Sequence, residues 1–324
     1  MAGTPTCRWT LARAACFAAA MTRSDTAGAG RDEPGRGIPL LLGSVTLFSV
    51  SDALTKRLGE TLPAVELAWL RYATFLAIAS ILLLRAPGQR MLRSRAPRLQ
   101  VLRGLGVIAS ALMFITGLQY LPLAEATAIN FVSPVFVTVL SVVFLGERAG
   151  WRRWSAIGVG MLGMLIILRP GSDAFTLAAL LPIGSAAAWA SAVTVTRRIG
   201  AVDAPETTLF WTAGVGFAVV TLVLPVLVLF GPAGVTLPSL SQIGLGLLVG
   251  LFSAAAQYLV VLAYRAAPAS VLAPFSYTQL LTSGLLGVAV FGHVPDGGTL
   301  LGAAVIAASG LYMAHRERVR ARGG

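Results

Sequence analysis

The feature that most limits how this chain can fold is a series of apolar stretches, each about as long as a membrane span. A helix needs about 20 apolar residues to cross the hydrocarbon core of a bilayer. Only 12% of the residues are charged, against about 25% in soluble proteins. The sequence therefore predicts an all-α membrane protein with ten transmembrane helices, near residues 38–57, 64–84, 101–119, 123–145, 153–168, 174–196, 207–230, 241–263, 268–291 and 298–314.

The positive charges between the predicted helices indicate an orientation. Cytoplasmic loops of membrane proteins carry an excess of Lys and Arg. Arginines gather in residues 85–103 and 148–153 and again after residue 315, whereas the opposite connections hold few cations, among them Lys56 and Arg57. We therefore expect a bacterial inner-membrane protein with both termini in the cytoplasm. The net charge of +12 follows from this loop pattern, so no nucleic-acid partner is expected.

The two ends of the chain are predicted to be tails. Residues 1–36 are expected to form a disordered cytoplasmic tail, and residues 316–324 a short basic one. The first 20 residues weakly resemble a signal peptide, and the alternative is translation from Met21. Both cysteines lie in those 20 residues, so no disulfide bond is expected in the membrane body.

Residues 37–171 and 172–315 are predicted to be two copies of one five-helix unit. With an offset of 141, TKRLG (55–59) matches TRRIG (196–200), and a Gly-Ser pair recurs at the same offset. Because five is an odd number, the two copies would insert in opposite orientations. Inverted repeats are typical of secondary transporters, in which the substrate site lies near the membrane midplane between the repeats.

A longer segment, LPLAEATAINFVSPVFVTVLSVVFLGERAGWRRWSAIGVGMLGMLIILRPG (121–171), carries family features. It has a helix with small residues, an Asn and a Pro, then a Gly-Glu-Arg turn and a Gly-rich helix that closes on Arg-Pro-Gly. Together with SDALTK (51–56) and Arg71, it resembles the EamA family of the drug/metabolite transporter superfamily. The resemblance covers residues 38–315 and implies a ten-helix secondary carrier without a cofactor.

The second half departs from this pattern at two places. His293 stands where the first half has Glu147, and Leu280 stands where the first half has Pro134. We therefore do not expect the two halves to gate identically.

The resemblance leaves the substrate and the direction of transport open. Some family members look like exporters of amino acids and amino-acid-derived metallophores, and others look like importers of riboflavin or S-adenosylmethionine. Our main expectation is export of an amino-acid-like or amino-acid-derived compound, with uptake of a vitamin or nucleoside-type metabolite as the alternative. Protons are the coupling ion considered, and the oligomeric state is left open.

Charged residues inside predicted helices are functional candidates, because charge is costly in the hydrocarbon core. At 1.5 Å per residue, Asp52 lies about 21 Å from the cytoplasmic start of its helix, and Arg71 about 18 Å from the same surface. We expect these two residues to recognise a charged substrate. The alternative is a local pair between Asp52 and Lys56, four residues apart. Glu66 and Glu125 lie closer to the outer surface and are interpreted as rim charges.

Uncharged polar and aromatic residues near the midplane are the other candidates. Single serines such as Ser253 and Ser283 are interpreted as contacts between helices. Asn130 is followed by Pro134, which removes one backbone hydrogen bond and can kink the helix. The predicted substrate-binding residues are Asp52, Arg71, Asn130, Trp189, Gln257, Tyr277 and Gln279.

Other functional classes find little support in the sequence. The two histidines, His293 and His315, lie near the ends of predicted helices, and neither a His-Glu-x-x-His motif nor a Cys/His spacing is present. No metal site is predicted. A membrane-embedded enzyme is therefore a remote alternative, and a small metabolite and the bilayer are the expected partners.

Overall fold

The computed structural model describes residues 34–85, 94–145, 151–169, 176–199, 203–230, 238–266 and 275–322, and every regular element within these ranges is a helix. The predicted tail of residues 1–36 lies almost wholly outside the described residues. The elements are α2 (Pro34–Gly59), α3 (Ala64–Arg85), α4 (Pro97–Tyr120), α5 (Leu123–Asn130), α6 (Ser133–Leu145), α7 (Trp151–Leu168), η2 (Leu177–Ala179), α8 (Leu180–Ile199), α9 (Pro205–Phe230), α10 (Leu240–Ala266), α12 (Thr278–Phe291) and α13 (Gly297–Arg322).

Most helices coincide with the predicted spans because the same apolar stretches form them. Within the described residues, six helical segments are long and apolar enough to cross a membrane, those of α2, α3, α4, α8 with η2, α9 and α10. Shorter apolar helices account for the rest. The chain is therefore a multi-pass membrane protein. At its end, α13 continues to Arg322, so residues predicted as a basic tail extend the last helix.

The prediction of one continuous helix over residues 123–145 is wrong. The helix is divided into α5 and α6 by a turn at Phe131 and Val132. Pro134 has no backbone N–H, so it cannot donate to the carbonyl of Asn130 four residues earlier. The expected proline kink therefore takes the form of a complete break. A turn residue, Tyr277, also precedes α12.

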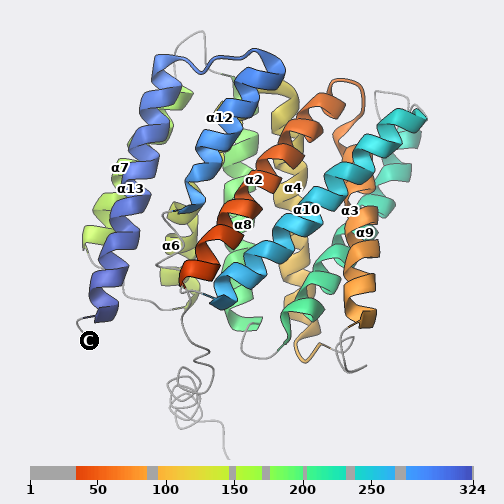
Figure 1. Ribbon diagram of the computed structural model, residues 1–324, viewed down its shortest axis with the longest axis horizontal. Helices are drawn as coiled ribbons and strands as arrows, with labels where there is room; N and C mark the ends of the chain where they lie inside the picture. Colours follow the sequence, from red (N-terminus) through yellow and green to blue (C-terminus); the bar gives the residue numbers. More distant parts are fainter. Residues whose placement is uncertain are drawn as a thin grey trace, which may run out of the picture.

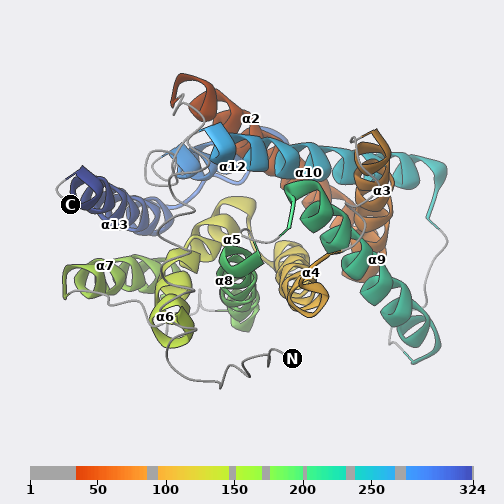
Figure 2. The same cartoon turned by 90° about the horizontal axis from the view of Figure 1, so that it is seen from below.

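The helices form two rows with a helix pair at each end. Viewed along the bundle, α2, α10 and α12 lie on one side, and α4, α5, α6 and α8 lie on the other (Figure 2). The pair α3 and α9 closes one end of the rows, and the pair α7 and α13 closes the other. Each row and each pair therefore contains helices from both halves of the chain.

The bundle has an upper and a lower end in the view of Figure 1. The upper end holds the connection between α2 and α3, and the lower end holds the C-terminus of α13. Both α3 and α10 begin at the upper end and run downward in parallel.

Glycines allow α3 to approach its neighbours closely. A β-carbon added to Gly246 of α10 would lie 2.5 Å from the Cδ1 atom of Leu70, and one added to Gly216 of α9 would overlap the ring of Tyr72. Small residues are the usual means of close helix contact in membranes. The position of α3 is thus fixed by its side chains, which occupy space left by glycines.

Candidate functional site

Buried serines on α2 join this helix to α10 and α12. Ser51 bonds Ser253 with 2.7 Å between the hydroxyl oxygens, and Ser49 bonds Ser283 at 3.1 Å. The expectation that Ser253 and Ser283 serve as contacts between helices is confirmed. These bonds also place the middle of α2 beside both of its neighbours, which positions Asp52.

Asp52 and Arg71 lie at the same level of the bundle, on either side of α10. The Ser51 hydroxyl donates to the carbonyl of Val249 at 3.2 Å, and a β-carbon on Gly250 would lie 2.8 Å from the carbonyl oxygen of Arg71. Asp52 is only 5% exposed, and the charge of Arg71 acts on it. Between these two described residues no ion pair forms, so an anionic or cationic group of a substrate has charged partners available at this level.

Lys56 has other partners than Asp52. Its ammonium group donates to the carbonyl oxygens of Leu118 at 2.9 Å and Leu121 at 2.6 Å, and lies 5.6 Å from the ring centre of Phe291. The last carbonyls of a helix have no partner within it, and they carry its negative dipole end. Lys56 therefore binds the C-terminal end of α4, which contradicts a local pair with Asp52.

Asn130 is the last residue of α5, directly at the break before α6. Its side-chain oxygen is buried and has no hydrogen-bond partner among the described residues. A buried carbonyl oxygen without a donor is unfavourable by about 1–3 kcal/mol. A ligand that donates an N–H or O–H group to this oxygen would remove that cost.

Tyr277 lies on the opposite row at the turn before α12. Its ring centre is 5.3 Å from that of Phe131, so the two turn residues pack against each other. Its hydroxyl lies against α13, where a β-carbon on Gly310 would overlap it. The structure thus places the hydroxyl of Tyr277 in a helix contact, and the predicted bond to substrate would require the side chain to turn.

The remaining predicted residues, Trp189, Gln257 and Gln279, are partly buried. Gln257 lies one turn from Ser253 on α10, and Gln279 one turn from Ser283 on α12, so both lie on helix faces near α2. Neither amide makes a side-chain hydrogen bond to the described residues. Trp189, on α8, belongs to the other row.

Arg103 is a partly buried cation of α4, whereas the sequence placed it among the loop arginines. Since α4 begins at Pro97, Arg103 lies in the second turn, and its guanidinium donates to the hydroxyls of Thr196 at 2.7 Å and of Thr212. It ties α4 to α8 and α9 near the lower end. Its position beside Gly104 could have indicated a buried place in the sequence, because a glycine allows a neighbouring helix, here α9, to approach closely.

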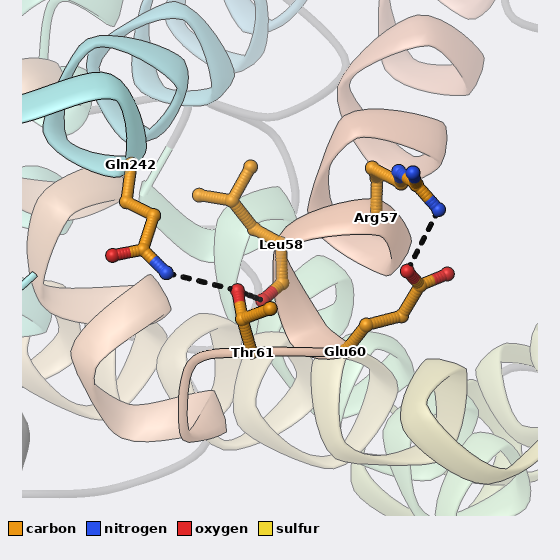
Figure 3. A network of polar contacts seen from close by, with 5 residues as sticks. All are labelled: Arg57, Leu58, Glu60, Thr61 and Gln242. Carbon is orange, nitrogen blue, oxygen red and sulfur yellow. Dashed lines mark hydrogen bonds and ion pairs between the residues drawn. The ribbon is translucent and has the colours of Figure 1, made fainter. Parts of the chain in front are cut away.

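The upper end of the bundle carries polar contacts between α2, its following turn and α10 (Figure 3). Arg57 pairs with Glu60 at 2.8 Å on the surface, and Gln242 donates to Thr61 at 3.1 Å. The interpretation of Glu66 as a rim charge is wrong, because this side chain is only 6% exposed.

Glu125 and His293 share a small hollow of about 50 Å³ at the upper end, between the start of α5 and the connection after α12. None of the predicted substrate-binding residues lines this hollow. It is thus separate from the polar residues near the middle of the rows.

The bundle of apolar helices, with polar and charged side chains held inside it, is that of a multi-pass membrane protein. Two consecutive segments, residues 35–169 and 176–314, match the model of the EamA-like transporter family. The chain belongs to this family.

Curated relatives include transporters of different substrates. A riboflavin transporter of Rhizobium johnstonii is 34% identical over 90% of this chain and 95% of that protein. An S-adenosylmethionine uptake transporter of Rickettsia bellii is 28% identical over 87% of this chain and 94% of that protein. The pseudopaline exporter CntI of Pseudomonas aeruginosa is 28% identical over 87% of this chain and 97% of that protein.

A solved crystal structure shares the fold, with a TM-score of 0.61 and 21% identity over 86% of this chain and 98% of the other.

Proposed function

We propose that the protein is a secondary carrier that moves a small polar metabolite across the bacterial inner membrane by alternating access between two inverted halves. The lower end of the bundle, with the C-terminus and the start of α2, faces the cytoplasm in this proposal. The end of α3 and the start of α4, which flank the arginine-rich stretch predicted to be cytoplasmic, lie at that end (Figure 1).

Equivalent contacts in the two halves support an inverted repeat. Ser44 of α2 donates to the carbonyl of Ala256 on α10 at 2.9 Å, and Ser185 of α8 bonds Ser110 of α4 at 2.9 Å. These serines belong to the Gly-Ser pair that recurs with an offset of 141. The first helix of each half thus packs against the third helix of the other half, as a two-fold relation requires.

The substrate class best supported is a neutral heteroaromatic metabolite of the riboflavin kind, taken up into the cell. The observation that carries this proposal is the similarity to riboflavin transporters over nearly the whole chain. The site offers matching chemistry: an unpaired acceptor on Asn130, the amides of Gln257 and Gln279, and the indole of Trp189. Asp52 and Arg71 would orient polar substituents.

Export of an amino-acid-derived compound is the second candidate. It is favoured by the similarity to the pseudopaline exporter and by the charges of Asp52 and Arg71, which suit a zwitterionic or carboxylated substrate. The two candidates differ in direction, so one experiment separates them.

Untargeted mass spectrometry of cells and medium would compare a deletion strain with the same strain after complementation. A compound lost from the cells and left in the medium on deletion supports uptake. Accumulation inside with loss from the medium supports export, and no change in any compound would contradict both. Asp52→Asn is expected to abolish transport without removing the protein from the membrane, and wild-type transport by this variant would exclude its role.

A further inference from the structure

The first turns of α3 and α9 share a sequence pattern. Residues 63–69 are PAVELAW and residues 205–211 are PETTLFW, with proline, leucine and tryptophan at matching places. In each case the turn lies beside the start of a helix from the other half, α10 at the upper end and α4 at the lower end. The two turns differ at four of their seven positions, and at one of these Glu66 matches Thr208.

The lower corner is a hydrogen-bond network around Asp203. The Ser94 hydroxyl, the Arg95 backbone N–H (2.9 Å) and the Gln100 amide (2.8 Å) all donate to its carboxylate. The same Gln100 nitrogen donates to Thr208 at 3.1 Å. Burial alone would raise the pKa of Asp203, but these bonds hold it below its usual value. This carboxylate is therefore a fixed anion.

The upper corner has Gln242 where the lower corner has Gln100, but Thr61 stands in place of Asp203. Gln242 of α10 donates to Thr61 at 3.1 Å (Figure 3). The same side chain accepts from the backbone N–H of Ser239 at 2.7 Å. Thr61 in turn donates to the carbonyl of Leu58 at 3.1 Å. These groups satisfy one another and leave Glu66 out.

Glu66 lies between α3 and the start of α10. Leu70, one turn further along α3, packs on Gly246, where an added β-carbon would lie 2.5 Å from the Cδ1 atom of Leu70. Gln242 lies one turn before Gly246 on α10, which runs in the same direction as α3. Glu66 is 6% exposed, and neither of its carboxyl oxygens has a hydrogen-bond partner among the described residues.

The described helices packed against Glu66 bring no free counter-charge to it, and the nearest cation on α3 itself is Arg71, five residues further along. The upper parts of α4, α9 and α10 contain no charged residue. On α2, Lys56 binds the carbonyls of α4, and Arg57 pairs with Glu60. An ionised carboxylate buried without a partner costs several kcal/mol, so burial in this setting favours the neutral, protonated form of a carboxyl group.

We propose that Glu66 is a proton-binding site of the carrier, which rests on the proposed transport function. The carboxylate takes up one proton and becomes a carboxylic acid when the corner between α3 and α10 is closed. It releases that proton to water when the corner opens. Because it lies in the first turn of α3, protons reach it from the upper, external face.

Glu66→Gln, which keeps the shape but cannot release a proton, tests this site, with Glu60→Gln as the control because Glu60 is exposed and already paired. Reconstituted proteins would be assayed with riboflavin for counterflow and for accumulation driven by an imposed pH gradient. Glu66→Gln is expected to retain counterflow and to lose at least about fivefold in gradient-driven accumulation, the lower end of coupling between two sites. Accumulation like that of the wild type would overturn the proposal.

A second measurement does not depend on the substrate. Infrared spectroscopy of the wild type at neutral pH should show the carbonyl band of a buried protonated carboxylic acid, absent in Glu66→Gln and present in Glu60→Gln. A wild-type spectrum that Glu66→Gln leaves unchanged would overturn the proposal. Lack of riboflavin counterflow in the wild type, with this band present, would instead count against the proposed substrate.

Discussion

Replacing Lys56 with methionine removes the ammonium group and keeps most of the apolar stem. The two bonds to the carbonyls of Leu118 and Leu121 are lost, and bonds to a charged group contribute about 1.5–3 kcal/mol each. We therefore expect Lys56→Met to lower stability by about 3 kcal/mol or more. For a chain of this size, that corresponds to a fall in the unfolding midpoint of about 5 °C or more.

The assay is thermal unfolding in detergent, followed by size-exclusion chromatography. Arg57→Met is the matched control, because the Arg57 and Glu60 side chains are 64% and 49% exposed, and an exposed ion pair contributes about 0–1 kcal/mol. Combining Lys56→Met with Asp52→Asn should give additive effects within about 0.5 kcal/mol. A clearly larger coupling energy would show that the ammonium group interacts with Asp52, and would refute the argument.

Other positions give equally definite expectations. Gly250→Ala should greatly reduce the yield of folded protein in size-exclusion chromatography, because its β-carbon would overlap α3, whereas Gly244→Ala, with nothing within 4 Å, should behave as wild type. Asn130→Ala should lower transport in proteoliposomes without lowering the unfolding midpoint, since no bond is lost; a matching loss of stability would argue for a structural role. Hydrogen bonds from Thr299 and then from Arg169 lower the pKa of Asp296 to about 2. Its stabilisation is thus complete above the unfolded pKa of 3.8 and lost as the pH falls toward 2, a loss that circular dichroism should detect in the wild type and not in Asp296→Asn.

Much of the fold could be predicted because apolar length alone determines which segments cross the bilayer. The proline at position 134 correctly indicated a disturbance in residues 123–145, although not a division into two helices. The sequence cannot state how helices pack sideways. The rows seen in Figure 2 depend on contacts between residues such as Ser51 and Ser253, about two hundred positions apart.

The candidate site was less predictable for the same reason. The level shared by Asp52 and Arg71 followed from the helical rise, because depth is a local property of a span. The partners of Lys56 and Arg103 did not, since they are backbone carbonyls and threonine hydroxyls that carry no distinctive signal. Glu66 was misinterpreted because nearness to a surface in sequence does not reveal whether a neighbouring helix covers the side chain.

The glycine contacts of α3 have a practical consequence for measuring motion. Leu70 and Tyr72 occupy space that Gly246 and Gly216 leave open, so α3 can neither rotate nor slide without withdrawing side chains from α10 and α9. The corner between α3 and α10 opens in the proposed proton release, whereas Tyr72 stays in the space left by Gly216, so spin labels or fluorophores on α3 and α9 should keep a constant separation throughout the transport cycle. They would provide a fixed spectroscopic reference against which the displacement of α5, α6 and α12 can be measured.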